Sequence, residues 1–264
     1  MNMTRITKGA KQLISHLAEE KKRIDNRGFD DMRKLEIEYD ISDQAEGSAR
    51  VKLGETEVYV GVKVGLGTPY PDTPNKGNLI VNAEVTPLAD EEYEPGPPRD
   101  WEVAIARVID RGIRESGSID VKKLCIKEGE RTWEVFVDVY VINDDGNLVG
   151  AGGIGALAAL KHAKLPAYNK KEDKIDKEGK RTKAIPITAE PIPISFAKVG
   201  SHLFVDPKKE EVQNATAHLV VTVDEKDRIV SLQRQGSEGL TFEEIEKCLK
   251  TAIKQSKIIR KQLA

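Results

Sequence analysis

Hydrophobic and polar residues alternate in several short runs in the first half of the chain, after one opening run with helical spacing. Over residues 6–17 apolar side chains recur every three or four positions, which predicts an amphipathic helix that packs on a sheet. Gly54 separates two strand-like runs and predicts a hairpin turn. Strict alternation predicts half-buried strands at four places: residues 35–41, 58–64, 79–85 and 133–141.

Two helices are predicted among these strands. Asp100 follows a Pro-rich stretch, so we expect its side chain to cap a helix whose apolar side faces inward. This helix would present Arg107, Arg111 and Arg114 on its outer side. A second helix, rich in Ala and Gly, is predicted from about residue 154 to residue 162.

A run of charged residues over 169–183 interrupts the hydrophobic pattern. It is too polar to pack, so we predict an exposed linker or loop at 169–184 between a first domain, 1–168, and a second domain, 185–264. The second domain repeats the order of strands before helix, and Thr241 with Glu244 predicts a capping box at its last helix. The whole pattern predicts an α+β fold of two sheet-plus-helices units.

Composition and charge narrow the classes of protein. The 264 residues are 39% hydrophobic and 33% charged, which is typical of a folded globular chain. A net charge of −2 argues against a protein that grips nucleic acid over its whole surface, so any RNA contact should be local. No apolar run approaches ~18 residues, which predicts no membrane span. Cys125 and Cys248 lack metal-ligand spacing and fit a reducing cytoplasm, the location we expect.

The glycines Gly150, Gly152 and Gly155 have the G-x-G-x-x-G spacing of dinucleotide-binding turns. Such a turn needs its glycines directly after a strand and an acidic residue ~20 positions later, whereas here a turn intervenes and a polar run follows. The alternative, which we favour, is that small residues keep one face of a helix narrow. That helix could then lie close to a sheet or to another helix.

Residues for catalysis or metal binding are not grouped in the sequence. None of the four histidines forms an H-E-x-x-H pair or stands beside a plausible nucleophile and base. The acidic pairs Asp90–Glu92 and Glu243–Glu244 fit an exposed loop and a helix start better than an acid–base site. We therefore predict no metal site and no cofactor.

The three arginines of the predicted helix at 100–116 stand at i, i+4 and i+7 and so form one stripe: Arg107, Arg111 and Arg114. Guanidinium groups at this pitch can hold phosphates by paired hydrogen bonds. The alternative is a solvated face on which the arginines pair with nearby carboxylates: Asp100, Asp110 and Glu115. Spacing alone favours this second interpretation.

Two segments carry a family likeness. Residues 23–27 read R-I-D-N-R and resemble the R-x-D-G-R motif that begins ribonuclease PH domains. Asn26 replaces the usual glycine, and Asn tolerates the same left-handed backbone. Residues 47–58 are similar to the hairpin G-S-A-x-V-x-L-G-x-T-x-V of this family. The resemblance spans nearly the whole chain and implies the ribonuclease PH fold, which is ribosomal protein S5 domain 2-like.

Within this family the chain resembles the archaeal exosome subunit that pairs with the active one. The segments 69–79 and 94–98 and the pair Asp206-Pro207 carry this likeness. Active members have a phosphate loop of roughly D-G-G-T-R-T, whereas residues 145–150 read D-G-N-L-V-G, and Leu and Val cannot bind phosphate. Their catalytic segment, roughly D-L-N-Y-x-E-D, ends in an acid where this chain has Val212. The resemblance implies that this chain has no catalytic residues.

The role implied by this resemblance is that of a non-catalytic subunit of the archaeal exosome, a phosphorolytic ring that degrades RNA from the 3′ end. The implied partners are three copies of the catalytic ribonuclease PH-like subunit alternating with three of this chain, S1/KH RNA-binding cap subunits and single-stranded RNA. This context favours Arg107 and Arg111 as RNA contacts, with Arg114 as a third. Two alternatives stay open: an active phosphate-dependent exoribonuclease with a rearranged site, and a free-standing RNA-binding scaffold.

Overall fold

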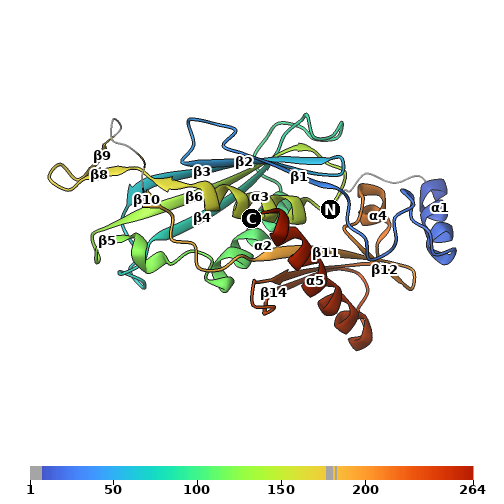
Figure 1. Cartoon of the computed structure of the whole chain (residues 1–264). Helices are drawn as coiled ribbons and strands as arrows, with labels where there is room; N and C mark the ends of the chain where they lie inside the picture. The colour runs from blue at the N-terminus through green and yellow to red at the C-terminus, as the bar shows by residue number, and fades with distance from the viewer. Residues whose placement is uncertain (1–7, 177–180, 182, 264) are drawn as a thin grey trace.

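The computed structural model describes residues 8–176, 181 and 183–263. Two β-sheets lie one above the other in Figure 1, and helices α2 (Asp100–Ser116) and α3 (Leu148–His162) lie between them. Helix α3 packs against strands of both sheets. It therefore joins the two halves of the molecule.

The first sheet is built from the N-terminal half of the chain, and its strands follow the alternation in the sequence. The strands are β1 (Leu35–Tyr39), β2 (Gly47–Leu53), β3 (Thr56–Gly67), β4 (Asn78–Val85), β5 (Cys125–Lys127) and β6 (Arg131–Asn143). Their order is β1-β2-β3-β6-β4, with β5 on β6, and only β4 and β6 run parallel among these pairs. Helix α2 and the turn η1 (Val121–Leu124) lie in the crossover that this parallel pair needs. The predicted hairpin is confirmed, because β2 pairs with β3 and Gly54 between them has φ +60°.

The second sheet comes from the C-terminal part and is antiparallel. Its strands are β11 (Ile192–Val199), β12 (His202–Val205), β13 (Ala217–Val223) and β14 (Ile229–Gly236), in the order β12-β11-β13-β14. Helix α4 (Lys209–Asn214) connects β12 to β13, and α5 (Phe242–Gln262) packs on β11 and β13. The predicted capping box is confirmed, because Thr241 and Glu244 each accept the other's backbone N–H through a side-chain oxygen.

The start of helix α2 differs from the prediction. Arg99 holds the N-cap position without a side-chain cap hydrogen bond, and Asp100 is the first helical residue. The prediction that Asp100 caps this helix is therefore wrong. Its carboxylate lies instead in the first turn, where the helix dipole favours a negative charge.

Helix α3 begins at Leu148, before the predicted start at about residue 154. The reason is Asn147, whose side-chain oxygen accepts the N–H of Gly150 at 3.0 Å and so caps the first turn. The glycines at 150, 152 and 155 consequently lie inside a helix and not in a strand-to-helix turn. This placement excludes the dinucleotide-binding interpretation.

Small residues of α3 face several neighbours. A Cβ on Gly153 would collide with the side chain of Pro193 in β11, and one on Gly155 would come within 2.7 Å of Val60 in β3. Gly152 faces α2 and the first sheet. The predicted close packing of small residues against a sheet and another helix is confirmed. Only the restriction to one face is wrong, because sheets enclose the helix on both sides and it is buried nearly all round.

Helix α1 (Lys8–Glu19) lies beside α4 at one end of the molecule in Figure 1. It packs on the end of the second sheet through a small cluster that is separate from the main core: Ile14, Ala18, Val199 and Phe204. The predicted amphipathic helix packed on a sheet is thus confirmed over the described residues. Residues 6 and 7, where the prediction began, lie outside them.

The charged segment after α3 is exposed, as predicted, but it has regular structure. Strands β8 (Ala167–Asn169) and β9 (Lys174–Asp176) form a hairpin that extends from one end of the molecule in Figure 1. Strands β7 (Lys164–Leu165) and β10 (Lys183–Ala184) pair beside it. One hydrophobic core runs from the first sheet through α3 to the second sheet and α5. The division into domains 1–168 and 185–264 remains a prediction.

Candidate functional site

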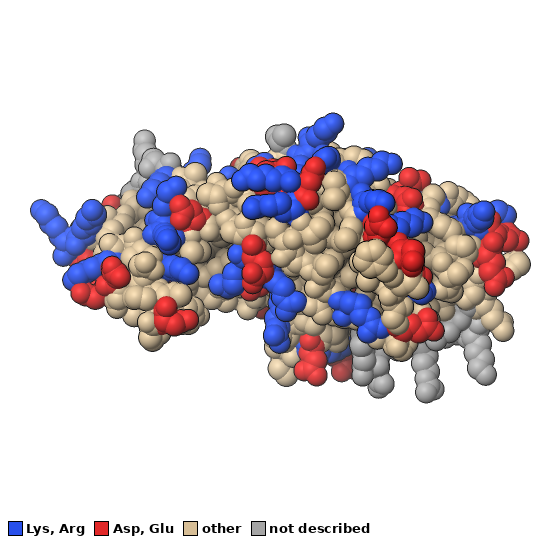
Figure 2. Space-filling model, turned by 90° about the horizontal axis from the view of Figure 1, so that it is seen from below, with Lys and Arg blue, Asp and Glu red and all other residues tan. Residues whose placement is uncertain are grey.

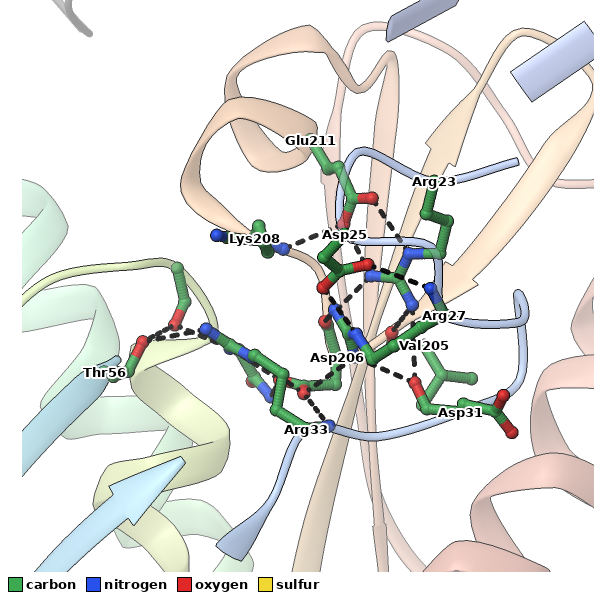
Figure 3. A network of polar contacts seen from close by, with 12 residues as sticks. Arg23, Asp25, Arg27, Asp31, Arg33, Thr56, Val205, Asp206, Lys208 and Glu211 are labelled. Carbon is green, nitrogen blue, oxygen red and sulfur yellow. Dashed lines mark hydrogen bonds and ion pairs between the residues drawn. The ribbon is translucent and has the colours of Figure 1, made fainter. Parts of the chain in front are cut away.

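A buried polar network joins the N-terminal motif to the segment between β12 and α4 (Figure 3). The guanidinium of Arg23 is fully buried and donates to both carboxylate oxygens of Glu211, at 2.9 and 2.5 Å. It also donates to the backbone oxygens of Val205 and Asp206. Asn26 has φ 63°, which confirms the left-handed backbone expected where glycine is usual. The R-x-D-N-R motif therefore has a structural role here, because Arg23 ties the N-terminal segment to the segment between β12 and α4.

Asp206 is the centre of this network and is completely buried. Arg33 donates to both of its carboxylate oxygens, at 2.9 and 2.7 Å, and Arg27 donates to one at 3.1 Å. Burial alone would raise the pKa of Asp206, but the hydrogen bonds and charge of Arg33 outweigh it and hold the pKa below its usual range. The carboxylate is therefore ionised and fixed.

The loop before α3 lies directly against the segment that follows Asp206. A Cβ on Gly146 would come within 2.6 Å of the backbone of Pro207, Lys208 and Lys209. Asn147 bridges the two segments, since its amide nitrogen donates to Asp206 at 2.7 Å while its oxygen caps α3. Residues 145–150 and 206–212, the two segments in which the resemblance implies lost catalytic residues, thus form one site.

This site has few free positive charges or hydrogen-bond donors with which to bind an anion. The nearby cations Arg33 and Lys208 both pair with the carboxylate of Asp145, at 3.2 and 3.3 Å. Burial raises the pKa of Asp145 in spite of these two cations. The side chain of Asn147 already takes the Gly150 N–H at the start of α3, where a phosphate would otherwise accept hydrogen bonds.

A cavity of about 600 Å³ opens beside this loop, between α2, the start of α3, α4 and the second sheet. Its apolar lining includes Trp101, Ile105, Leu148, Val149, Phe196 and Val212. Val212, which stands where the resemblance implies an acid, is among the lining residues and has no proton to donate. Sequence reasoning gave no sign of this cavity, because its walls come from five separate parts of the chain.

The three predicted RNA-binding arginines share helix α2 but differ in their contacts. Arg107 is exposed and makes no ion pair or hydrogen bond with any residue that the structure describes. Arg111 donates to the side-chain oxygen of Gln233 at 2.6 Å. Arg114 pairs with Asp110 at 2.8 Å and donates to the backbone oxygen of Leu79. The alternative of local carboxylate pairing therefore applies to Arg114 alone among the three.

The surface charge is mixed. Figure 2 shows Lys and Arg side chains interspersed with Asp and Glu over the face seen from below, without a continuous field of either sign. This agrees with the net charge of −2. Any attraction for RNA must come from a few positions, as the composition indicated.

Comparison with known protein families shows that both halves of the chain match one family. Residues 31–166 match domain 1 of the 3′ exoribonuclease family, and residues 189–255 match its domain 2. The chain belongs to the 3′ exoribonuclease family. Membership of this ribonuclease PH family and the α+β fold were predicted from the sequence, and both are confirmed.

Archaeal members of the 3′ exoribonuclease family resemble the chain over almost its full length. "Exosome complex component Rrp42" of Pyrococcus furiosus is 44% identical over 250 residues, which cover 94% of this chain and 90% of that protein. The protein of the same name from Archaeoglobus fulgidus is 43% identical over 242 residues, covering 91% and 90%.

Solved structures agree with these relatives. A chain of the Archaeoglobus fulgidus exosome with RNA bound to the active site superposes with a TM-score of 0.90 at 40% identity and covers 97% of this chain and 98% of that one. An archaeal exosome core gives a TM-score of 0.85 at 38% identity, with 96% of each chain covered. Separately, none of the helices in the described part of the chain is long and apolar enough to cross a membrane.

Proposed function

We propose that this chain is a non-catalytic subunit of an archaeal exosome, in which it supports the active site of a catalytic ribonuclease PH-like partner. The observation that carries the proposal is the site formed by residues 145–150 and 206–212. There Asn147 caps α3, Leu148 and Val149 follow it, and Val212 stands at the acid position.

Phosphorolysis requires an oriented phosphate and stabilisation of charge at the bond that breaks. In this site Arg33 and Lys208 form ion pairs with Asp145. The side chain of Asn147 accepts the Gly150 N–H in the first turn of α3, so this donor is not free to bind a phosphate. Asp144 also lines this part of the cavity, but its carboxylate is held by the Tyr93 hydroxyl and the Gly146 N–H. The isolated chain should therefore lack activity, not merely have less of it.

The proposed assembly is a ring of three copies of this chain and three of the catalytic homologue, with S1/KH cap subunits and single-stranded RNA, in the cytoplasm. The relatives named as exosome components, and their coverage of nearly the whole chain, support this assembly. Arg107, which is exposed and unpaired in the described structure, and Arg111, whose partner is neutral, would contact the RNA backbone. Arg114 would contribute less because Asp110 holds it.

A phosphorolysis assay tests the proposed inactivity. The purified chain should release no nucleoside diphosphate from oligo(A) and inorganic phosphate, whereas its mixture with the catalytic homologue should release it. Release by the isolated chain above background would instead favour the active, rearranged exoribonuclease.

The proposed assembly has its own measurement. Native mass determination after co-expression with the catalytic homologue should give the mass of a three-plus-three hexamer. If the two chains stay apart at every concentration tried, the free-standing RNA-binding scaffold becomes the better interpretation.

A further inference from the structure

The cavity beside the start of α3 contains uncharged polar groups that are not used by the fold. The side chains of Ser195, Gln213, His218 and Gln235 line it, and none of the four makes a hydrogen bond to another residue within the described structure. Amide, hydroxyl and imidazole groups together supply both donors and acceptors. A ligand could use them without breaking any contact that holds the protein together.

The cations around the same cavity already interact with carboxylates or with an aromatic ring. Lys209 pairs with Asp90 and lies 3.9 Å from the carboxylate of Asp144. Arg99 lies over the ring of Tyr93. Burial lowers the pKa of His218, so its ring is neutral near pH 7. The cavity therefore suits an uncharged ligand and disfavours a phosphate dianion.

The walls of the cavity suit a flat ligand. Trp101 lines it, with its ring 5.4 Å from that of Tyr93, and Phe196 and Ile105 add apolar surface. A volume of about 600 Å³, mostly apolar lining and a few convergent polar groups are the usual features of a small-molecule site. Aromatic side chains that stack on a base, and glutamine amides that hydrogen-bond to its edge, are a recurrent way of holding a nucleobase.

We propose that this cavity binds an uncharged nucleobase, held by stacking on Trp101 and by hydrogen bonds from Gln213, His218 and Gln235. The base could belong to a free nucleoside or to the end of an RNA chain. The proposal rests on the cavity alone and does not require the exosome assignment. Its failure would leave that assignment unchanged.

Titration of the full-length chain with adenosine tests the proposal, both alone and in complex with the catalytic homologue. A Trp133→Phe background leaves Trp101 as the only tryptophan, so its fluorescence reports on the cavity. Adenosine should change this fluorescence saturably, and AMP and ATP should bind progressively more weakly. Tighter binding of ATP or of inorganic phosphate, or no binding of any of the four common ribonucleosides, would overturn the proposal.

Competition separates the two sources of the base. Displacement of adenosine by oligo(A) with a free 3′-hydroxyl would assign the cavity to an RNA end. Binding of adenosine that oligo(A) does not displace would assign it to a free nucleoside. Either result supports the proposal.

Variants locate the binding. Ala104→Phe would fill the cavity that Ala104 lines and should abolish adenosine binding, whereas Val103→Phe, on the exposed side of the same helix, should leave it unchanged. Gln235→Ala changes an exposed residue and cannot compromise folding as a core substitution might. It should weaken binding about two- to tenfold, as expected for one lost hydrogen bond. Unchanged affinity in both Ala104→Phe and Gln235→Ala would place the ligand elsewhere and refute the site.

Discussion

At the scale of single residues, Asp206 organises the contact between the two halves of the chain. It accepts hydrogen bonds from Arg27 and Arg33, in the segment between α1 and β1, and from Asn147 at the start of α3. A buried charge of this kind is stable only because it is fully paired. The side chains that surround it therefore depend on its presence.

Substitution of Asp206 should be strongly destabilising. Asp206→Asn keeps the shape of the side chain but leaves Arg33 as a buried cation with its main partner neutralised. We expect a loss of about 3–5 kcal/mol in the free energy of unfolding, measured by urea denaturation. The control Asp173→Asn removes an exposed ion pair with Arg131 and should leave stability nearly unchanged. Equal effects in the two variants would contradict the role of burial.

The carboxylate of Asp206 should also affect how the stability of the protein depends on pH in the acid range. Because the folded-state pKa of Asp206 is depressed, its contribution to stability is present above the ordinary value of about 4 and is lost as the pH falls through the folded-state pKa. The pKa of Asp145 is raised and acts in the opposite direction. Urea midpoints measured from pH 6 to pH 3 should therefore fall less steeply in Asp206→Asn than in the wild-type chain.

The RNA contacts proposed for the arginines of α2 can be tested within the proposed three-plus-three ring. Arg107→Glu combined with Arg111→Glu should weaken RNA binding at low salt and leave assembly intact, since charge contacts are strongest there. A matched control reverses Lys250 and Lys254, exposed residues with the same spacing on α5. Affinity that falls equally in both double variants would indicate a general charge effect and no local contact.

Local sequence rules predicted the conformation of some residues correctly, but they could not predict contacts between residues far apart in the sequence. The left-handed backbone of Asn26 was predictable because it depends on one residue type in one motif. The role of Arg33 was not, since its main partner lies 173 positions away and nothing near it in sequence marks it. The contacts of Arg111 and Arg114 likewise depend on strands that pack beside α2.

At the scale of elements, the close packing of helix α3 limits the size of its side chains. Gly153 lies against Pro193, and the rigid proline ring cannot move aside easily. Gly153→Ala should therefore lower the free energy of unfolding by about 1–3 kcal/mol through overpacking, despite a gain of up to about 1 kcal/mol in helix propensity. Thermal unfolding followed by circular dichroism would measure the change.

A glycine in an open position gives the control for this prediction. Gly9 lies in α1, and a Cβ added to it would have no neighbouring atom within 4 Å. Gly9→Ala should keep or slightly increase stability. If Gly153→Ala were also neutral or stabilising, the close contact between α3 and β11 would not limit the size of this residue.

The sequence pattern predicted the strands better than this helix. Alternation revealed β3, β4 and β6 because each buries one face and exposes the other. Helix α3 is apolar on every side and therefore has no periodic signal to mark its beginning. Its cap, Asn147, was interpreted as part of a degenerate loop, although Asn is a common N-cap residue.

At the scale of the whole molecule, one core crosses the predicted domain boundary. The two halves should consequently unfold together. In a Cys125→Ser background, tryptophan fluorescence reports on the first half, while alkylation of Cys248 reports on α5, because burial raises the pKa of that thiol to about 12. Both signals should change at the same urea concentration. Separate midpoints would show that residues 1–168 and 185–264 fold independently.

The overall fold was predictable because the family likeness extends along nearly the whole chain and the strand pattern agrees with it. The cavity beside the start of α3 was not predictable. Trp101, Phe196 and Gln235 come together only when α2 docks on the second sheet, and no local pattern specifies that contact.

The position of α3 between the sheets also affects how the chain is made. Ribosomes release the N-terminal part first, and the segment of roughly 100 residues after α3 takes about 5–20 s to synthesise at typical rates. Strand β11 comes early in this segment, and until it has been made the side of α3 that contains Gly153 has no cover from the second sheet. The nascent chain therefore carries an apolar helix with one uncovered side until β11 emerges, and at this stage it depends most on chaperones.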